Sequence, residues 1–267
     1  MKRVLCLAML VLILTVGALP AAAITGGELD GEGHPNVGLM IADVDGEPAW
    51  RCTGTLIAPR VFLTAGHCVR DGTTAARVWF DTDLMDNEEY PYGGDTSIEG
   101  TPIPHPDYGS GDADSHDVGL VILDEAITDI KLALLPSPGL LSQLKADRIL
   151  REGGPEGVYF IEVGYGGTLE SWPPPVLTYD RVRRVVESEY VALTQFWLHL
   201  SQKAVFDEGG TCFGDSGGPS FWVDPDGNEI VVAVTSTGDA QCVATGLNYR
   251  VDVPEILEWI ASQFPAE

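Results

Sequence analysis

A serine enclosed by small residues near the carboxyl end of the chain constrains this sequence more than any other feature. Residues 214–219 read Gly-Asp-Ser-Gly-Gly-Pro, with Ser216 at the centre. Glycines allow a tight backbone turn. In such a turn, backbone N–H groups can converge on one point, as the stabilisation of an oxyanion requires. The segment therefore indicates a nucleophilic serine whose own backbone takes part in the chemistry.

The order of the possible partner residues separates two folds that use such a serine. The segment also fits the Gly-x-Ser-x-Gly pattern of α/β-hydrolases, in which the catalytic histidine follows the serine. All five histidines of this chain precede Ser216. His67 lies in Thr-Ala-Gly-His-Cys, and Asp117 begins Asp-Val-Gly-Leu, directly before an apolar run. The order His, Asp, Ser is that of the chymotrypsin-type triad.

Together the three motifs resemble the signatures of trypsin/chymotrypsin-like secreted serine proteases, over about residues 24–264. The resemblance implies an all-β fold of two antiparallel six-stranded β-barrels (chymotrypsin-like) with a C-terminal helix. It places the N-terminal barrel in residues 24–133, and the C-terminal barrel and helix in residues 134–267. Pattern alone predicts only an all-β sandwich or barrel, because short apolar segments alternate with turn residues.

Strands are predicted in both halves of the chain, and one helix is predicted at its end. Asp252 is the expected N-cap of this helix, with Pro254 in its first turn. Its expected apolar stripe is Ile256, Leu257, Ile260 and Phe264. The expected strands include residues 37–41, 54–57, 61–64, 118–123, 160–163, 181–186 and 230–235.

The resemblance implies a role for each triad residue. Ser216 attacks the substrate carbonyl, while His67 takes its proton and returns it to the leaving amine. Asp117 accepts the other ring N–H of the histidine and fixes its tautomer. Asp112 and Asp114 lie in the same acidic loop, but Asp117 directly precedes an apolar strand that can hold it buried. The neighbouring His116 is interpreted as a solvated loop histidine.

The nucleophile segment implies an oxyanion hole and an activation pair. The expected oxyanion donors are the backbone N–H groups of Gly214 and Ser216. Asp215 needs a partner, since burying an unpaired carboxylate is costly. Relatives often begin Ile-Val-Gly-Gly, and here Ile24-Thr25-Gly26-Gly27 follows Ala23. We therefore expect cleavage after Ala23, with no separate propeptide, and pairing of the Ile24 α-amine with Asp215. The alternative is that Asp215 only caps a turn.

A primary specificity pocket is implied at five positions. Its base would be Gly210, six residues before the serine, so the aspartate typical of trypsin is absent there. We expect a neutral pocket that takes apolar or aromatic side chains, although Glu208 or Asp239 could supply a negative charge. The expected pocket residues are Gly210, Thr211, Ser236, Gly238 and Gly246.

The first 23 residues predict a secretory signal peptide. Lys2 and Arg3 precede an apolar stretch over residues 5–19, and Ala21-Ala22-Ala23 offers a small-residue cleavage site. A retained membrane anchor is the alternative, but the apolar run is short for a bilayer span. We expect a secreted protein with no membrane attachment once this leader is removed.

Four cysteines lie outside the leader. An even number in a secreted chain favours two disulfides, with three possible connectivities. The resemblance implies the pairs Cys52–Cys68 and Cys212–Cys242. A zinc site is the alternative, but the sequence has no C-x-x-C pair.

The chain is strongly acidic, with a net charge of −25. Nucleic acid is therefore disfavoured as a partner, because its phosphates would be repelled. The expected partners are protein or peptide substrates and protein inhibitors. No cofactor is expected, with one alternative: calcium, bound by an oxygen-rich loop. The acidic residues of that loop are Asp81, Asp83, Asp86, Glu88 and Glu89.

The expected function is a secreted serine endopeptidase that works through His67, Asp117, Ser216 and an acyl-enzyme intermediate. A protease-shaped binding protein without strong catalysis is one alternative, although the chain keeps all three triad residues. An esterase that uses the same triad is the other alternative.

Overall fold

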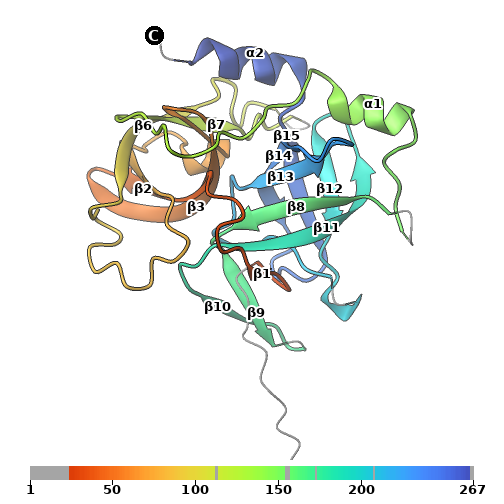
Figure 1. Cartoon of the computed structure of the whole chain (residues 1–267), viewed down its shortest axis with the longest axis horizontal. Helices are drawn as coiled ribbons and strands as arrows, with labels where there is room; N and C mark the ends of the chain where they lie inside the picture. Colours follow the sequence, from red (N-terminus) through yellow and green to blue (C-terminus); the bar gives the residue numbers. More distant parts are fainter. Residues whose placement is uncertain (1–23, 112–113, 154–156, 172, 207, 265–267) are drawn as a thin grey trace, which may run out of the picture.

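Two β-barrels packed side by side form the body of the molecule in the computed structural model (Figure 1). This confirms the expected chymotrypsin-like architecture. The predicted signal peptide lies outside the described part of the chain. The structure describes residues 24–111, 114–153, 157–171, 173–206 and 208–264.

The N-terminal barrel is closed, with strand order β2-β3-β4-β7-β6-β5. Its interior is apolar and includes Met40, Leu56, Phe62 and Val121, all fully buried. Pairing of β4 with β7 brings the segments after Thr64 and before Gly119 to the same edge of the barrel. The strands are β2 (Val37–Val44), β3 (Glu47–Ala58), β4 (Val61–Thr64), β5 (Ala75–Trp79), β6 (Ile98–Pro104) and β7 (Gly119–Leu123).

The C-terminal barrel follows the order β11-β12-β15-β14-β13-β8 and closes where β8 pairs with β11. A short strand, β1 (Glu28–Leu29), adds to β11, and a separate hairpin joins β9 (Gly167–Ser171) to β10 (Val176–Tyr179). The barrel strands are β8 (Tyr159–Gly164), β11 (Arg184–Leu193), β12 (Trp197–Ser201), β13 (Pro219–Val223), β14 (Glu229–Gly238) and β15 (Thr245–Arg250).

One hydrophobic cluster joins the two barrels. It combines Val37 and Leu63 of the first barrel with Val163 and Phe221 of the second, and it includes Ile256 of the last helix. Because these side chains are fully or almost fully buried, the two barrels share one core. Loops at the seam between the barrels are therefore held in fixed relative positions.

The helices differ from the prediction in their number and in the extent of the last one. The expected C-terminal helix, α2 (Pro254–Ser262), is present and buries Ile256 and Ile260, whereas Phe264 lies beyond it and is exposed. A second helix, α1 (Leu140–Ala146), was not predicted. It has only seven residues, which is too short for a clear helical period. No helix in the described ranges is long and apolar enough to cross a membrane.

Asp252 is not the N-cap of α2, contrary to the prediction; that position is Val253, which makes no side-chain cap. The Asp252 carboxylate instead accepts the N–H of Leu141 at 2.8 Å, in the first turn of α1, and pairs with Arg250 at 2.8 Å. The prediction was wrong because it assigned Asp252 to the nearest helix along the chain. The fold brings a more distant helix to this residue.

Candidate active site

His67 and Asp117 meet at the edge of the N-terminal barrel. His67 lies in the short helical turn η1 (Gly66–Cys68) just after β4, and Asp117 lies just before β7. Because β4 pairs with β7, the two residues become neighbours despite a separation of 50 residues. The Nδ1 atom of His67 lies 2.9 Å from Asp117 Oδ2. The backbone N–H of His67 also donates to Asp117 Oδ1 at 2.8 Å.

Asp117 is buried, with 5% of its surface exposed. Burial works to raise the pKa of this carboxyl, but hydrogen bonds from His67 and Ser236 hold it below its ordinary value. The Ser236 hydroxyl donates to Asp117 Oδ2. Sequence reasoning placed Ser236 in the specificity pocket alone and missed this contact, since nothing local marks a serine as the partner of a residue 119 positions away.

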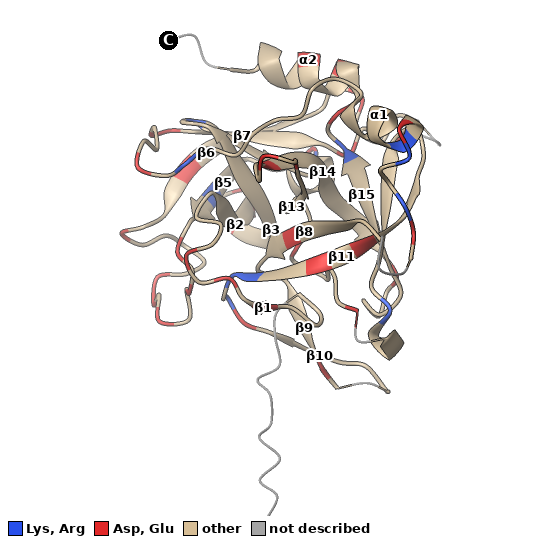
Figure 2. Ribbon diagram, turned by 45° about the vertical axis from the view of Figure 1, so that its right-hand side comes forward, with Lys and Arg blue, Asp and Glu red and all other residues tan. Residues whose placement is uncertain are grey.

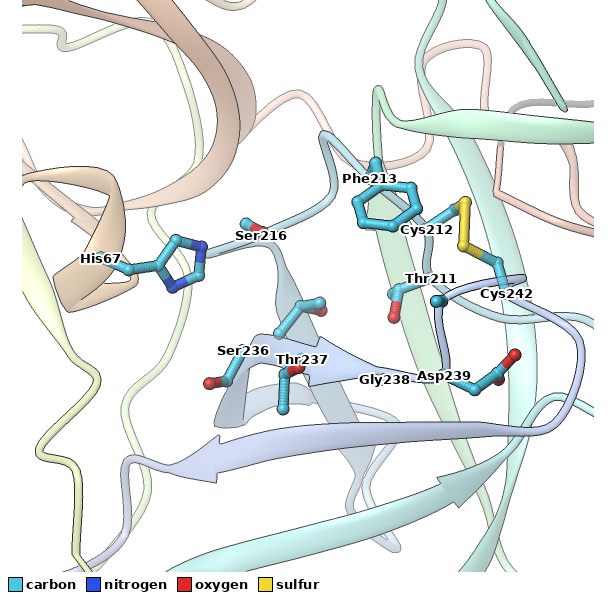
Figure 3. A pocket seen from close by; sticks show the side chains of 12 residues that line it. His67, Thr211, Cys212, Phe213, Ser216, Ser236, Thr237, Gly238, Asp239 and Cys242 are labelled. Atoms are coloured by element: carbon cyan, nitrogen blue, oxygen red, sulfur yellow. A yellow bond between two sulfur atoms is a disulfide. The ribbon is translucent and has the colours of Figure 1, made fainter. Parts of the chain in front are cut away.

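Ser216 lies on a loop that is tied to the first barrel. The N–H of Thr53 on β3 donates to the Ser216 carbonyl at 2.9 Å, and the Thr53 hydroxyl donates to the Gly214 carbonyl at 2.9 Å. His67 and Ser216 line the same cavity and lie at the same end of it in Figure 3. The hydrogen bonds of the described residues include none between these two side chains, and such catalytic contacts often tighten only with substrate bound.

Gly214 lies at a position that excludes other residues. Its φ of +100° is unfavourable for side-chain-bearing residues, and a Cβ would lie 3.1 Å from Gly166 Cα and 3.2 Å from Arg51 Nε. Within the described part of the chain, the N–H groups of Gly214 and Ser216 donate to no protein acceptor. Both expected oxyanion donors are therefore available to a ligand.

Asp215 is fully buried beneath this loop. Its carboxylate accepts the N–H of Gly166 at 2.6 Å and that of Cys212 at 2.9 Å. Burial nevertheless raises its pKa to about 7. Glu162 lies nearby, also fully buried, and its pKa is likewise raised to about 7 by burial. Sequence reasoning missed Glu162, because a lone glutamate within an apolar strand carries no motif.

Ile24, the other member of the expected activation pair, is fully buried. The next residue, Thr25, exchanges two backbone hydrogen bonds with Gly210, at 2.9 and 2.8 Å. In the uncut chain the Ile24 nitrogen belongs to a peptide bond, so it carries no charge to offer Asp215. Pairing of a free Ile24 amine with Asp215 therefore stays a prediction.

A cavity of about 340 Å³ adjoins His67 and Ser216. Of the expected pocket residues, Thr211, Ser236 and Gly238 line it, whereas Gly210 and Gly246 are not among its lining residues. These two glycines lie against the side chain of Gln202, which sequence reasoning did not identify. The other lining residues are Cys212, Phe213, Thr235, Thr237, Asp239, Ala240 and Cys242.

Asp239 and Glu208, the two acids that could give this cavity a negative charge, form hydrogen bonds with other groups. Asp239 is on its lining, but its carboxylate accepts backbone N–H groups of its own loop, including those of Ala244 at 2.8 Å and Thr245 at 3.0 Å. Burial works to raise the pKa of Asp239, but these N–H groups hold it below its ordinary value. Glu208 accepts the hydroxyl of Ser201 and is not among the lining residues.

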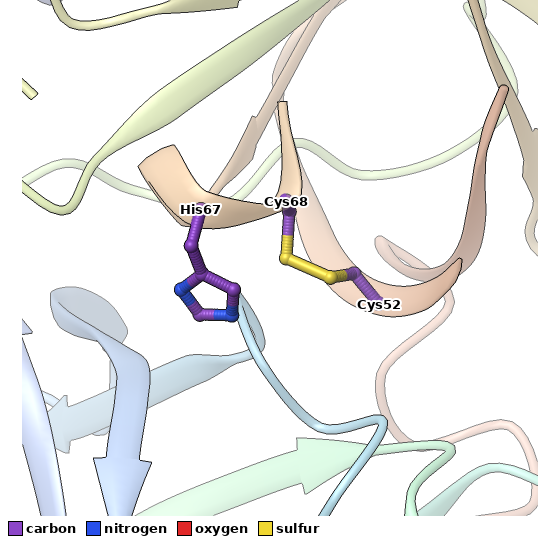
Figure 4. Close-up of side chains that lie close together, drawn as sticks. All are labelled: Cys52, His67 and Cys68. Carbon is purple, nitrogen blue, oxygen red and sulfur yellow. A yellow bond between two sulfur atoms is a disulfide. The ribbon is translucent and has the colours of Figure 1, made fainter. Parts of the chain in front are cut away.

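Both expected disulfides are present in the structure. Cys52–Cys68 joins β3 to the turn that carries His67 (Figure 4). Cys212–Cys242 joins the nucleophile loop to the loop after β14, on the wall of the cavity (Figure 3). The pairing implied by the resemblance is confirmed, and these four sulfurs are not arranged as zinc ligands.

The residues around Asp117 have structural contacts of their own. Asp114 accepts the hydroxyl of Tyr249 at 2.7 Å, while Asp112 lies outside the described residues. His116 is not a solvated loop residue, contrary to the prediction. Its ring stacks on that of His105, with centroids 4.8 Å apart, and His105 in turn contacts Trp259 edge-on.

Acidic residues are spread over the loops and strands of both barrels (Figure 2). The acidic loop considered for calcium spans residues 81–89. Among the described residues, its carboxylates do not form a group of three whose oxygens lie within 4.8 Å of one another. Calcium binding therefore stays a prediction from sequence.

Comparisons with known proteins agree with this arrangement. A family model described as Trypsin matches residues 32–260, a range that contains the site described above. Serine protease 1 of Drosophila melanogaster is 28% identical over 233 residues, which span 84% of this chain and 78% of the fly protein. Proproteinase E of Bos taurus is 28% identical over 205 residues, or 72% of this chain and 74% of the bovine protein.

Among solved structures, that of HL collagenase covers 90% of this chain and 95% of its own, with a TM-score of 0.64. The two sequences are 18% identical, so this likeness shows the fold alone.

Proposed function

Because the chain belongs to the trypsin family of serine proteases, we propose that it is a secreted endopeptidase that cleaves peptide bonds through Ser216, His67 and Asp117. The main support is the buried Asp117 carboxylate, which lies 2.9 Å from one ring nitrogen of His67 while that histidine shares a cavity with Ser216. The disulfides favour an oxidising compartment, as does the leader predicted in residues 1–23.

The proposed reaction has two stages. Ser216 Oγ attacks the substrate carbonyl as His67 Nε2 takes its proton, and the N–H groups of Gly214 and Ser216 stabilise the oxyanion. The C–N bond breaks when His67 returns the proton to the leaving amine, which leaves an acyl-enzyme. Water then hydrolyses the ester with His67 again as base. Asp117 stays ionised and stabilises the imidazolium.

We propose further that a free Ile24 amine activates the enzyme by pairing with Asp215. The fully buried carboxyl of Asp215 has a pKa near 7, because the N–H groups that it accepts do not compensate its burial. An ammonium group would supply the missing charge. One residue added before Ile24 should therefore abolish most activity and leave secretion unchanged. Full activity of that extended form would rule out the pairing, and a chain beginning at Ile24 is the matched control.

The specificity cavity is proposed to be neutral. Its one lining carboxylate, that of Asp239, is already compensated by loop N–H groups, and Glu208 lies off the lining. A buried guanidinium or ammonium would lack a partner, whereas an apolar side chain gains about 1.5–3 kcal/mol on burial. We therefore expect cleavage after uncharged residues.

Labelling with a fluorophosphonate tests the proposed function, because only an activated serine reacts readily with it. Mass spectrometry should locate the label on Ser216, and Ser216→Ala should lose both labelling and peptidase activity while staying folded. His67→Ala should lose activity to a similar extent, with little further loss in the double variant. Peptide cleavage by purified Ser216→Ala would contradict the assignment.

Matched peptide and ester substrates with the same acyl group separate the remaining alternatives. Cleavage of the ester alone would identify an esterase. Absence of both labelling and cleavage in the protein that begins at Ile24 would contradict the peptidase and the esterase alike and favour the binding protein.

A further inference from the structure

Gln202 occupies the space where the family pattern leads one to expect an open pocket base. It follows β12 directly and is 1% exposed. A Cβ on Gly210 would overlap the Cγ of Gln202 and would lie 2.7 Å from its Nε2. A Cβ on Gly246 would lie 2.8 Å from the same Nε2. Neither glycine therefore borders open space, because the Gln202 side chain packs against both of them.

Hydrogen bonds fix this carboxamide to the cavity wall. Its Nε2 donates to the Thr211 carbonyl at 3.0 Å and lies 3.1 Å from the Thr211 hydroxyl. Thr211 is itself a lining residue of the cavity. The Oε1 atom is buried and has no hydrogen-bond partner among the described residues. A buried polar atom without a partner costs free energy. The packing and the Nε2 contacts of Gln202 must therefore offset that cost to hold the amide in this position.

We infer that Gln202 is the specificity-determining residue of this cavity, closing its floor behind Thr211 with a neutral amide and so directing cleavage to bonds after uncharged side chains. The inference rests on the proposed peptidase function. Specificity is thereby assigned to the side chain of Gln202, which directly follows β12, and not to Gly210. It also accounts for the glycines at positions 210 and 246, since a Cβ at either one would overlap or crowd the amide.

The substitution Gln202→Glu tests the inference with little change of volume. A carboxylate here could accept the Thr211 hydroxyl, but it would also be repelled by the Thr211 carbonyl oxygen. Its negative charge would therefore be incompletely compensated and would favour a cationic substrate group. We expect the ratio of kcat/KM for Lys and Arg substrates to that for Leu substrates to rise by about 10- to 100-fold. The control Gln195→Glu adds the same charge at an exposed site and should leave this ratio unchanged.

A second variant covers the case in which a buried carboxylate prevents folding. Gln202→Gly should empty the space between Gly210 and Gly246 and deepen the cavity. We expect kcat/KM for substrates with Trp or Tyr before the cut to rise by about tenfold relative to kcat/KM for Leu substrates. An unchanged preference in either folded, fluorophosphonate-reactive variant would overturn the assignment of Gln202.

Binding of benzamidine, a small aromatic cation, separates this inference from the proposed function. Its affinity, measured by calorimetry, should rise in Gln202→Glu relative to the parent protein and to Gln195→Glu, whether or not any peptide is cleaved. Equal affinity in all three proteins would overturn the role of Gln202. Failure of labelling and cleavage with a clear rise in benzamidine affinity would overturn only the peptidase proposal.

Discussion

At the scale of single residues, the buried carboxylate of Asp117 collects polar contacts from His67 and Ser236. It accepts the backbone N–H of His67, faces the ring of the same residue and accepts the hydroxyl of Ser236. Three donors keep the carboxyl ionised despite its burial. The protein thus holds a charge in its interior by satisfying each oxygen.

Ser236→Ala should weaken this arrangement without removing it. The pKa of Asp117 should rise because one donor is lost, and kcat/KM should fall by about tenfold, as for loss of a hydrogen bond to a charged group. Thr237→Ala is the control, because Thr237 lines the same cavity without a hydrogen bond to Asp117. Equal kinetics in the two variants would contradict the role of Ser236.

The same substitution has a pH signature. The pKa of Asp117 is lower in the folded state than in the unfolded chain, so its stabilising contribution is present at neutral pH and is lost as the pH falls through the folded-state value. Ser236→Ala raises that folded-state value and should move the acid loss of stability to higher pH. Thermal unfolding measured between neutral and acidic pH, with Ser216→Ala as background to prevent autolysis, checks this shift.

At the scale of elements, the short helix α1 depends on a residue from the other end of the domain. Asp252 caps its first turn and pairs with the almost fully buried Arg250. The helix is too short to be stable from its own propensity. Its place against β11 therefore comes from tertiary contacts, among them the burial of Leu141 and Leu144.

Asp252→Ala should destabilise the protein strongly. It leaves Arg250 buried without its carboxylate partner, a change that typically costs about 3–5 kcal/mol, and it removes the cap of α1. Asp147→Ala, at the exposed end of the same helix, should change the free energy of unfolding by less than about 1 kcal/mol. Urea unfolding gives the free energy of unfolding of both variants. Equal losses in the two would show that the Asp252 contacts contribute no net stability.

At the scale of the whole molecule, the nucleophile loop is the place where the two barrels meet. Gly217 and Gly218 let this loop approach Thr64 and Thr53 of the first barrel and Val163 of the second. A side chain at either position would separate surfaces that are now in contact. These two glycines therefore let the two barrels pack closely against each other.

Gly217→Ala and Gly227→Ala form a matched pair that tests this role. Both glycines have positive φ, +82° and +84°, but a Cβ at Gly217 would overlap the Thr64 hydroxyl, while nothing lies within 4 Å at Gly227. Gly227→Ala should cost about 1–2 kcal/mol from backbone strain alone. Gly217→Ala should cost roughly 1–3 kcal/mol more from overpacking and should lose fluorophosphonate labelling. Similar unfolding free energies and labelling rates in the two variants would contradict the proposed role.

The sequence alone indicated the fold class, the chain order of His67, Asp117 and Ser216, the disulfide pairing through a family resemblance, and seven of the fifteen strands in the described ranges. These features are encoded in short motifs and in alternating apolar residues, which depend on neighbours along the chain. Only the tertiary structure revealed the Gln202 side chain against Gly210 and Gly246, the Ser236 hydroxyl on Asp117 and the helix that Asp252 caps. Gln202 meets Gly246, Ser236 meets Asp117 and Asp252 meets Leu141 only in the folded chain. Such contacts have no local signal, because they arise from strand pairing and packing between residues tens of positions apart.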